Sequence, residues 1–384
     1  MAKFVDIADQ ITEDIRLGRF GKPGDRFLTV RALAEQSSVS LVTAQKIVAR
    51  LRDNGVLVGN ENSPTSIGPI AGTDLPGNDS TGKRPIALVL PDLTNPFFNR
   101  LSRHVQRTAA EQGHSVLVAG TESKLERERE VIQDFLELGI DGLLLCAGLD
   151  ESCALFYREL QSQGFPLVFV SRQPEHVEAD FVVPHNLMGG VAVASHFVES
   201  GFSTAGYIGF GPRLRRDSRL AGFRAELLEF GVELPPEWLA NDNGRGIEHG
   251  YRAMQRVMDG RKRPRAVFAL NDLLAIGAMQ YCHDHGIDVP GEVAIAGFDD
   301  LPESRVTAPP LTTVAYPIEA TAQIAVQCLI DRIASDEAFT TRRILLEPRL
   351  VIRGSTDPQA ETRRKQLLLN PKAAKLHIDT RAVT

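Results

Sequence analysis

The sequence predicts an α/β protein in which two lobes, each built on a doubly wound parallel sheet, follow a smaller N-terminal unit. From Arg84 onward, short runs of nearly continuous apolar residues alternate with amphipathic segments, a pattern typical of parallel strands that helices cover on both faces. These strand–helix units form two successive series, which indicates two lobes with a cleft between them. Before residue 71, apolar residues recur at helical spacing instead. We therefore expect a small helical unit followed by a two-lobed region.

The N-terminal unit is expected to cover residues 1–70. Thr29 and Ser40 each precede a segment with helical periodicity, and both side chains can accept a backbone N–H, so both are expected N-caps. The predicted elements are a helix ending near Gly18, a helix from Thr29 to Gln36, a helix from Ser40 to just before Gly55, a strand at 56–58 and a polar tip at 60–64. Two helices joined by a tight turn, the second with a polar N-terminus, have the geometry that enters the major groove of DNA.

Polar side chains of the third predicted helix are the candidate DNA contacts. Thr43, Gln45 and Lys46 lie on its outer face, away from its apolar residues. Glutamine can form two hydrogen bonds with adenine, and threonine can contact a phosphate or a thymine methyl group. Residues 1–68 hold nine Lys or Arg and eight Asp or Glu, so the local net charge is only +1. The alternative interpretation is a small helical bundle used for protein contacts.

The same unit resembles the GntR family of winged helix-turn-helix domains over residues 4–60. The similar segments are 7–11, 18–20, 23–26, 31–34, 39–40, Thr43 and 51–57. The resemblance implies that these residues contact DNA: Arg31, Ser40, Thr43, Gln45 and Lys46. Leu41 and Gln45 stand where the family commonly has arginine, and the tip at 60–66 lacks the usual glycine-threonine ending, so no operator sequence is implied.

Composition and cysteine content indicate a soluble protein of a reducing compartment. Apolar residues make up 43% of the chain and charged residues 24%, which is ordinary for a globular protein. The net charge is −6, so attraction to DNA must come from a local patch. None of the four cysteines forms a C-x-x-C pair, which argues against a disulfide framework or a zinc site. Without an apparent signal peptide or membrane span, we expect a cytoplasmic protein that does not associate with membranes.

The remaining chain is expected to contain a linker, the two-lobed domain and a tail. Residues 71–83 are rich in Gly, Pro, Ser and Thr, which favours a linker. The larger domain should span 84–354, with the first lobe at about 84–185 and 315–335 and the second at about 186–314 and 340–354. Residues 355–384 form the expected basic tail, and the net charge from Gln359 to Thr384 is +4. A solvated tail is the main interpretation and a nucleic-acid contact the lesser one.

Residues 84–354 resemble the sensor domain of LacI/GalR regulators, which shares the fold of periplasmic sugar-binding proteins. The similar segments are 91–98, 141–145, 219–223, 271–277, 297–300 and 309–314. The resemblance implies a regulator of transcription, most often a repressor, that forms a homodimer through this domain and binds operator DNA and a small-molecule effector. The effector would be a sugar or sugar derivative bound between the lobes.

The candidate effector residues follow the predicted strands, where ligands of doubly wound sheets bind. They are Asn95, Phe97, Arg172, Arg219, Asn271 and Asp299. Their amide, guanidinium and carboxylate groups supply the donors and acceptors that a polyol needs, and Phe97 can lie against a sugar ring. Three alternatives remain open: Phe98 is a core residue, Arg219 forms a salt bridge with Asp217 or Asp299, and Asp272 is the N-cap of the following helix.

Departures from the family pattern near this cleft concern charge. Ser171 and His185 stand where relatives have acidic residues, and Arg245 lies where relatives offer an aromatic side chain. These changes remove negative charge or add positive charge. An acidic or phosphorylated sugar is therefore a second candidate class of effector.

The sequence favours a regulator over two other classes of protein. The sequence has no nucleotide-binding glycine motif, no P-loop, no nucleophile elbow and no His-Glu-x-x-His motif, so we expect no enzyme, no catalytic residues, no cofactor and no metal site. A transport-type sugar-binding protein that lacks regulatory DNA binding is the alternative function. It would require export, and it does not explain the helical N-terminal unit.

Overall fold

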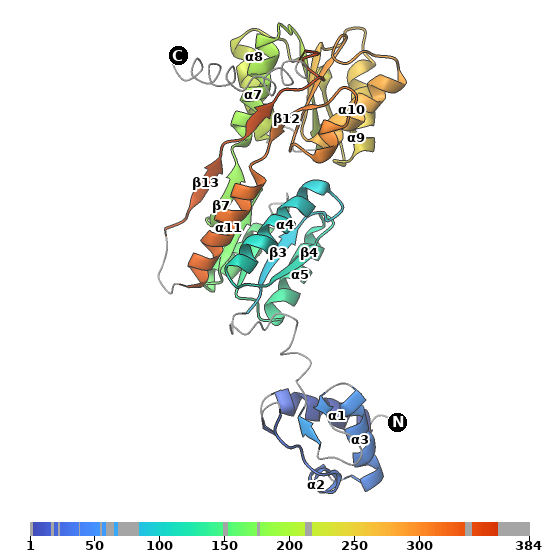
Figure 1. Cartoon of the computed structure of the whole chain (residues 1–384), viewed down its shortest axis with the longest axis vertical. Coiled ribbons are helices and arrows are strands. Elements are labelled where there is room, and N and C mark those ends of the chain that lie inside the picture. The colour runs from blue at the N-terminus through green and yellow to red at the C-terminus, as the bar shows by residue number, and fades with distance from the viewer. Residues whose placement is uncertain are drawn as a thin grey trace, which may run out of the picture. The chain divides into compact units, whose positions relative to one another are not determined.

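The computed structural model describes residues 3–16, 19–21, 24–37, 39–53, 56–58, 65–67, 84–148, 153–174, 177–211, 217–334 and 340–359. They belong to a small N-terminal unit before Ile86 and a larger unit after it (Figure 1). The tip at 60–64, the linker at 71–83 and most of the basic tail lie outside the described residues. The expectations for those segments therefore stay predictions.

The N-terminal unit packs helices α1 (Lys3–Arg16), α2 (Val30–Gln36) and α3 (Leu41–Asp53) with an antiparallel pair of strands, β1 (Leu57–Val58) and β2 (Ser66–Ile67). Its core includes large aliphatic side chains that are 5% exposed or less: Ile11, Ile15, Leu33, Ile47 and Leu51. The predicted caps are confirmed. Thr29 Oγ1 accepts a hydrogen bond from the Ala32 N–H at 3.3 Å, and Ser40 Oγ accepts one from the Thr43 N–H at 3.2 Å.

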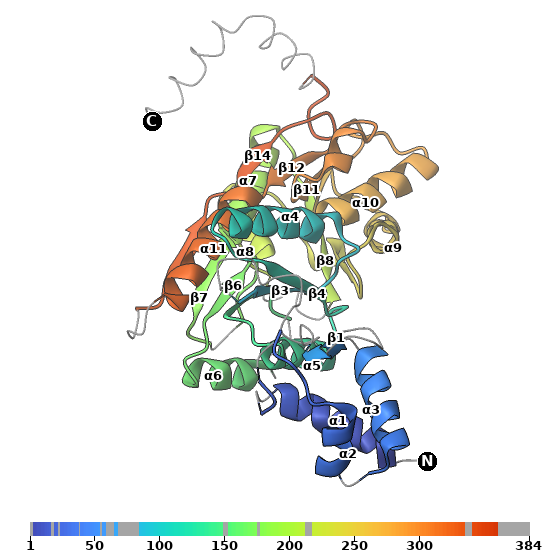
Figure 2. The ribbon, with the colours of Figure 1, turned by 60° about the horizontal axis from the view of Figure 1, so that its bottom comes forward.

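The first lobe of the larger unit is built on a parallel sheet. Its strands, in spatial order, are β4 (Val116–Gly120), β3 (Ile86–Leu90), β5 (Gly142–Leu145), β6 (Leu167–Val170), β7 (Asp180–Pro184) and β13 (Arg343–Leu346). Figure 2 shows α4 (Pro96–Glu111) and α11 (Ile318–Ile333) on one face, and α5 (Leu125–Glu137) and α6 (Ala154–Ser162) on the other. Alternate residues of β3 pack into the two separate cores that result. This explains the unbroken apolar runs in the sequence.

The second lobe repeats this architecture. Its strands, in spatial order, are β9 (Leu239–Asp242), β8 (Ala205–Phe210), β10 (Ala266–Ala269), β11 (Ala294–Phe298), β12 (Thr312–Ala315) and β14 (Arg349–Val351), and β14 runs antiparallel to β12. Helices α7 (Asn186–Glu199) and α8 (Ser218–Glu229) pack on one face, and α9 (Ile247–Met258) and α10 (Asp272–Asp284) on the other. The α/β class with two lobes on largely parallel sheets is confirmed.

Two boundaries differ from the predicted ones. The second lobe was expected to resume at about residue 340. Strand β13 instead pairs with β7 in the first lobe, and the chain returns to the second lobe only near β14. Strands β13 and β14 are short, half-buried edge strands. Such strands lack the long apolar runs that would assign them to a lobe from the sequence. Ser355 and Thr356, which the sequence placed in the tail, are buried. Ser355 Oγ donates to the Ile295 carbonyl oxygen at 2.6 Å and so fixes the segment after β14 to the second sheet.

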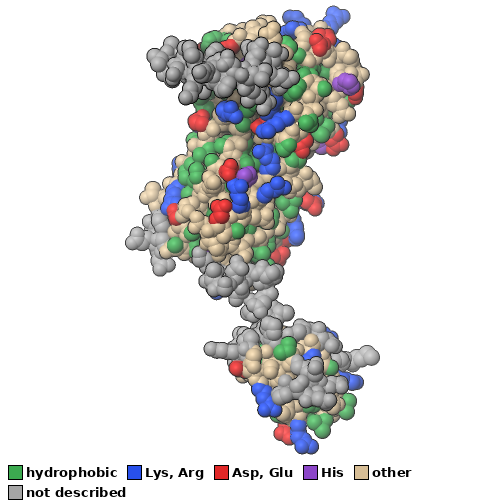
Figure 3. Space-filling model, viewed as in Figure 1, with side chains coloured by type: hydrophobic (Ala, Val, Ile, Leu, Met, Phe, Trp, Pro, Cys, Tyr) green, Lys and Arg blue, Asp and Glu red, His purple; other side chains and the backbone are tan. Residues whose placement is uncertain are grey.

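Basic side chains are distributed differently over the two units. On the visible face of the N-terminal unit, Lys and Arg side chains lie apart from one another, whereas on the larger unit they gather where the two lobes meet (Figure 3). The four cysteines are buried and unpaired. Within the described ranges, every helix is too short or too polar to span a bilayer.

Candidate functional site

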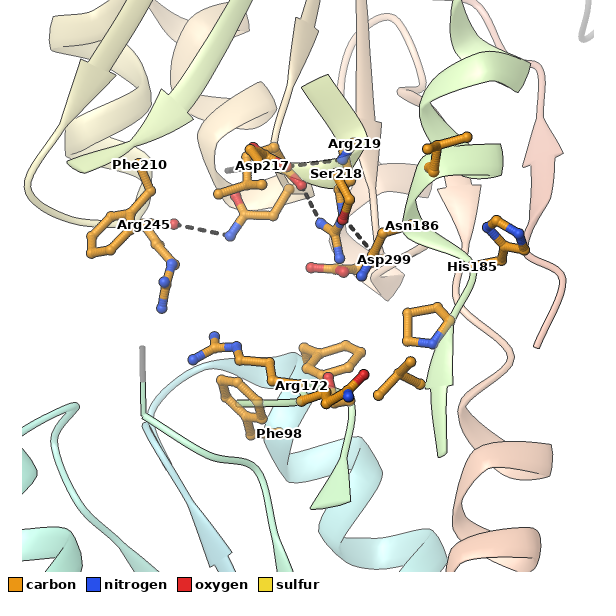
Figure 4. Close-up of a pocket in the computed structure, with 18 of the residues that line it drawn as sticks. Phe98, Arg172, His185, Asn186, Phe210, Asp217, Ser218, Arg219, Arg245 and Asp299 are labelled. Atoms are coloured by element: carbon orange, nitrogen blue, oxygen red, sulfur yellow. Dashed lines mark hydrogen bonds between the residues drawn. The ribbon is translucent and has the colours of Figure 1, made fainter. Parts of the chain in front are cut away.

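A cavity of about 490 Å³ lies between the lobes, within the size range of small-molecule sites. Its lining includes every predicted effector residue: Asn95, Phe97, Arg172, Arg219, Asn271 and Asp299. These residues follow the carboxyl ends of β3, β6, β8, β10 and β11, where parallel strands of one sheet all open toward the same edge. The close-up in Figure 4 shows side chains of both lobes pointing into this space.

Arg219, in the first turn of α8, is held by several groups of the second lobe. Its Nε donates to Asn186 Oδ1 at 2.9 Å, and its Nη1 donates to the Leu270 carbonyl oxygen. The guanidinium also stacks on the Phe298 ring, 3.5 Å from the centroid. Asp217 is the N-cap of α8, and its carboxylate accepts the Arg219 backbone N–H at 3.0 Å. The Asp217 side chain therefore contacts the backbone of Arg219 and not its guanidinium, in contrast to the salt bridge considered from the sequence. These contacts orient the Arg219 side chain at the cavity wall.

The two asparagines of the predicted site each stand at the N-terminus of a helix. Asn271 is the N-cap of α10: its Oδ1 accepts the Leu274 N–H at 2.8 Å, and its Nδ2 donates to the Arg245 carbonyl oxygen at 3.3 Å. The alternative that assigned this cap to Asp272 is wrong. Asp272 is fully buried and instead accepts hydrogen bonds from the Leu301 N–H and the Thr313 hydroxyl. Asn95 Oδ1 accepts the Phe97 N–H at 2.9 Å at the start of α4.

The aromatic residues after β3 are at once part of the core and part of the cavity wall. Phe97 and Phe98 are 5% and 4% exposed, and both line the cavity. Phe97 contacts the Tyr316 ring edge-on, with centroids 4.8 Å apart, while the Arg172 guanidinium lies 5.5 Å from the centre of the Phe98 ring. Phe98 is therefore a core residue, as one alternative held, and its ring also supports the Arg172 guanidinium at the cavity wall.

Asp299 is buried at the end of β11 in a strained conformation. It is 7% exposed, and its φ of 117° lies in a region that residues other than glycine rarely adopt. Ser171, across the cavity, has a φ of 65°. Burial raises the pKa of Asp299 to about 6, although the charges of Arg219 and Arg172 act in the opposite direction. Such strain and such a shifted pKa are common at functional sites.

The raised pKa of Asp299 predicts how stability changes with pH. Between the ordinary pKa near 3.8 and the folded-state value of about 6, the folded protein binds a proton that the unfolded chain has released. The free energy of unfolding of the wild type, minus that of Asp299→Asn, should therefore fall by up to ~3 kcal/mol as the pH rises through this interval and stay constant above it. Urea unfolding followed by the fluorescence of Trp238 measures this difference, because the chain has one tryptophan. A difference that is flat or rises with pH would contradict the assignment.

Several cavity residues were not among the predicted ones. Asn186, Ser218 and Phe210 line the cavity, as does Arg245, whose guanidinium lies over the Phe210 ring at 3.8 Å. The sequence signal for Arg245 was its place in the segment before α9, which the family resemblance suggested lies near the ligand. Asn186 had a signal too, because it comes two residues after the end of β7.

In the N-terminal unit, the predicted DNA-binding residues occupy one end and the outer face of α3 and the start of α2. Arg31, Ser40, Gln45 and Lys46 are exposed, and Thr43 is half-buried. The Ser40 and Thr43 hydroxyls are 2.8 Å apart and hydrogen-bonded to each other. Leu41 and Val42, which were not predicted to bind, are 49% and 61% exposed in the first turn of α3. Exposed apolar side chains at this position can contact thymine methyl groups.

Comparison with known proteins defines the class. Residues 194–356 match the periplasmic binding protein-like domain family. The chain is 30% identical over 341 residues to the HTH-type transcriptional regulator DegA of Bacillus subtilis, an alignment that covers 86% of this chain and 98% of DegA. It is 28% identical over 275 residues to the ribose operon repressor of Escherichia coli, covering 70% of this chain and 81% of the repressor.

A solved structure agrees. A LacI-family transcriptional regulator from Sanguibacter keddieii is 34% identical and superimposes with a TM-score of 0.64 over 71% of this chain and 98% of its own. These relatives define a DNA-binding regulator of transcription. The chain belongs to the LacI family of transcriptional regulators.

Proposed function

We propose that this regulator is a repressor whose operator affinity is controlled by a sugar or sugar derivative bound between its two lobes. The observation that carries the proposal is the presence in one chain of a helix-turn-helix unit with an exposed polar face and a cavity lined by polar groups from both lobes. The relatives include proteins named as repressors, which supports repression as the sign of regulation. A regulator of transcription acts where the chromosome is, in the cytoplasm.

We infer that the N-terminal unit is a winged helix of the GntR type. The motifs that resemble that family extend through α1, α2 and α3, and the strands β1 and β2 that follow α3 are arranged as the sides of a wing. Arg26, before α2, forms an additional antiparallel bridge with Ser66, which joins a third segment to these strands. The tip of the wing lies outside the described residues.

Control of DNA binding is expected to work through a homodimer. The N-terminal unit is short and has no heptad repeat, so residues 84–354 are the expected dimerisation region. A dimer places two recognition helices on the half-sites of one operator. An effector that binds one arrangement of the lobes better than the other shifts the equilibrium between them, and a coupling free energy of about 1–3 kcal/mol is typical.

A gel-shift experiment with the DNA upstream of the protein's own gene tests this function. A specific complex should form, and small-molecule extracts of the cell should weaken it. The complete absence of a complex, both with and without such extracts, would favour the transport-type sugar-binding protein. A complex that no metabolite affects would retain DNA binding and reject control by an effector.

Two substitutions in α3 should separate base recognition from phosphate binding. Gln45→Ala should reduce the preference for the operator over other sequences by about 1–3 kcal/mol, because a glutamine that contacts a base edge is lost. Lys46→Ala should weaken binding to all DNA and lower the slope of log affinity against log salt by about 1, because one phosphate contact is lost. Fluorescence anisotropy with operator and scrambled duplexes at several salt concentrations measures both quantities.

Glu35→Gln, in α2, is a suitable comparison for fold effects because Glu35 is exposed and outside α3. It should not reduce affinity, since it removes a negative charge. If Gln45→Ala and Lys46→Ala both retain wild-type affinity, specificity and salt slope, α3 is not the recognition helix.

A further inference from the structure

Two arginines face each other across the cavity from opposite lobes. Arg172 follows β6 of the first lobe, and Arg245 precedes α9 of the second. Figure 4 shows their guanidinium groups extending from the two sides into the same space. Each is supported from behind by an aromatic ring, Phe98 for Arg172 and Phe210 for Arg245, with the guanidinium 5.5 and 3.8 Å from the ring centre.

Within the described part of the chain, the N–H donors of both guanidinium groups have no hydrogen-bond acceptor. Among the described residues, no carboxylate or carbonyl oxygen accepts a hydrogen bond from the guanidinium of Arg172 or Arg245, whereas that of Arg219 has two acceptors. A guanidinium has five N–H donors, so the pair presents a large set of unpaired donors to the cavity. Stacking on a ring holds a guanidinium in place without occupying those donors.

Neither acidic residue of the described cavity lining forms a hydrogen bond or an ion pair with Arg172 or Arg245. Of the described residues that line the cavity, Asp217 and Asp299 are acidic. Asp217 accepts the Tyr207 hydroxyl and the backbone N–H of Arg219 as the cap of α8, and Asp299 is buried at the end of β11. Burial and, next, the charge of Arg172 lower the pKa of the Arg245 guanidinium. Since arginine stays protonated in proteins, burying the Arg245 charge costs free energy, and the nearby charge of Arg172 adds to that cost.

The geometry points to an anionic effector that bears hydroxyl groups, whose phosphate or carboxylate group binds between Arg172 and Arg245 and so bridges the two lobes. This inference rests on the proposed function, because it specifies the ligand of the same cavity. Guanidinium groups pair with carboxylates and phosphates through two parallel hydrogen bonds. An anion would also replace the repulsion between the arginines by attraction to both, so its charge would favour closure of the lobes. Asn186 and Ser218, at the positive ends of α7 and α8, also line this space.

Calorimetric titration of the full chain with matched ligands tests this inference. The probes are ribose with ribose 5-phosphate, glucose with glucose 6-phosphate and with gluconate, and orthophosphate alone, each at concentrations up to the millimolar range. At least one anionic probe should bind the wild type about tenfold or more tightly than its neutral counterpart. Arg172→Gln and Arg245→Gln should each remove most of that preference. Arg224→Gln, an exposed arginine on α8 of the second lobe, should retain it.

The experiment distinguishes the possible outcomes. Preference for glucose 6-phosphate identifies a phosphate site, and preference for gluconate a carboxylate site. The inference is wrong if no anion binds. It is also wrong if a neutral sugar binds as tightly as its anionic counterpart and Arg245→Gln changes neither affinity. If an anion binds as expected but does not alter the gel shift, the proposed control of DNA binding is rejected, whereas the anion site is still supported.

As a check that needs no organic ligand, phosphate should raise the melting temperature of the wild type more than chloride does at equal ionic strength. In the double variant Arg172→Gln/Arg245→Gln, the difference should shrink to the general stabilisation that phosphate gives any folded protein through its exclusion from the surface. This variant removes a repulsion, so it is expected to fold. Equal phosphate effects on wild type and double variant would also overturn the inference.

Discussion

Arg219→Ala is expected to abolish the response of operator binding to the effector and to leave operator binding itself intact. Arg219 is the one predicted effector residue whose side chain contacts the ends of three elements of the second lobe, through Asn186 of α7, the Leu270 carbonyl after β10 and the Phe298 ring of β11. Its loss removes a donor to the ligand and the orientation of Asn186 together. Since each hydrogen bond to a charged group contributes about 1.5–3 kcal/mol, effector affinity should fall by about 100-fold or more.

The measurement is operator affinity by fluorescence anisotropy, with and without an effector found in the titrations. Arg224→Ala is the matched control, because Arg224 is exposed on the same helix. Arg219→Lys should fail to restore the response, since an ammonium group cannot contact Asn186 and Leu270 with the fork geometry of a guanidinium. If Arg219→Ala keeps the full response to the effector, the assigned site is incorrect.

The parts of the site that the sequence predicted share one physical origin. Asn95, Arg172, Asn271 and Asp299 each come shortly after an apolar run, and the carboxyl ends of parallel strands meet along one edge. Once the strands are recognised, the convergence of these residues on one cavity follows from topology alone. The helix caps Thr29 and Ser40 were predictable for a similar reason, because a cap depends on contacts within a few residues of the chain.

The parts that the sequence did not predict depend on long-range packing. The choice between Asn271 and Asp272 as cap of α10 is decided by Thr313 and Leu301, which hold Asp272 from more than 25 positions away. Strand β13 joins the first lobe only because β7 presents a free edge to it. Arg245 reaches the cavity from a segment without an apolar run, where the ring of Phe210 supports it. Local patterns carry no information about such partners.

A second large effect is expected where α7 and α8 touch. Gly190 of α7 lies so close to α8 that a Cβ atom there would be 2.0 Å from the Arg219 carbonyl oxygen. In the reciprocal contact, a Cβ on Gly222 of α8 would be 2.0 Å from the Leu187 carbonyl oxygen. Both clashes are with backbone, so no side-chain rotation can relieve them. The glycines therefore set the distance between the two helices whose first turns supply Asn186 and Arg219 to the cavity.

Gly190→Ala should destabilise the sensor by about 3 kcal/mol and weaken effector binding in the same protein. Alanine favours a helix over glycine by about 1 kcal/mol, but forcing two packed helices apart costs more than this gain. Urea unfolding followed by Trp238 fluorescence measures the loss, with Gly246→Ala as the control, because a Cβ at Gly246 would have its nearest neighbour, His249 Nδ1, 3.6 Å away. The same displacement moves the backbone of Arg219, so effector affinity should fall even under conditions in which the variant remains folded. If Gly190→Ala is as stable as the wild type, α7 and α8 are not held at this distance. The inference that their contact positions Arg219 would then be rejected.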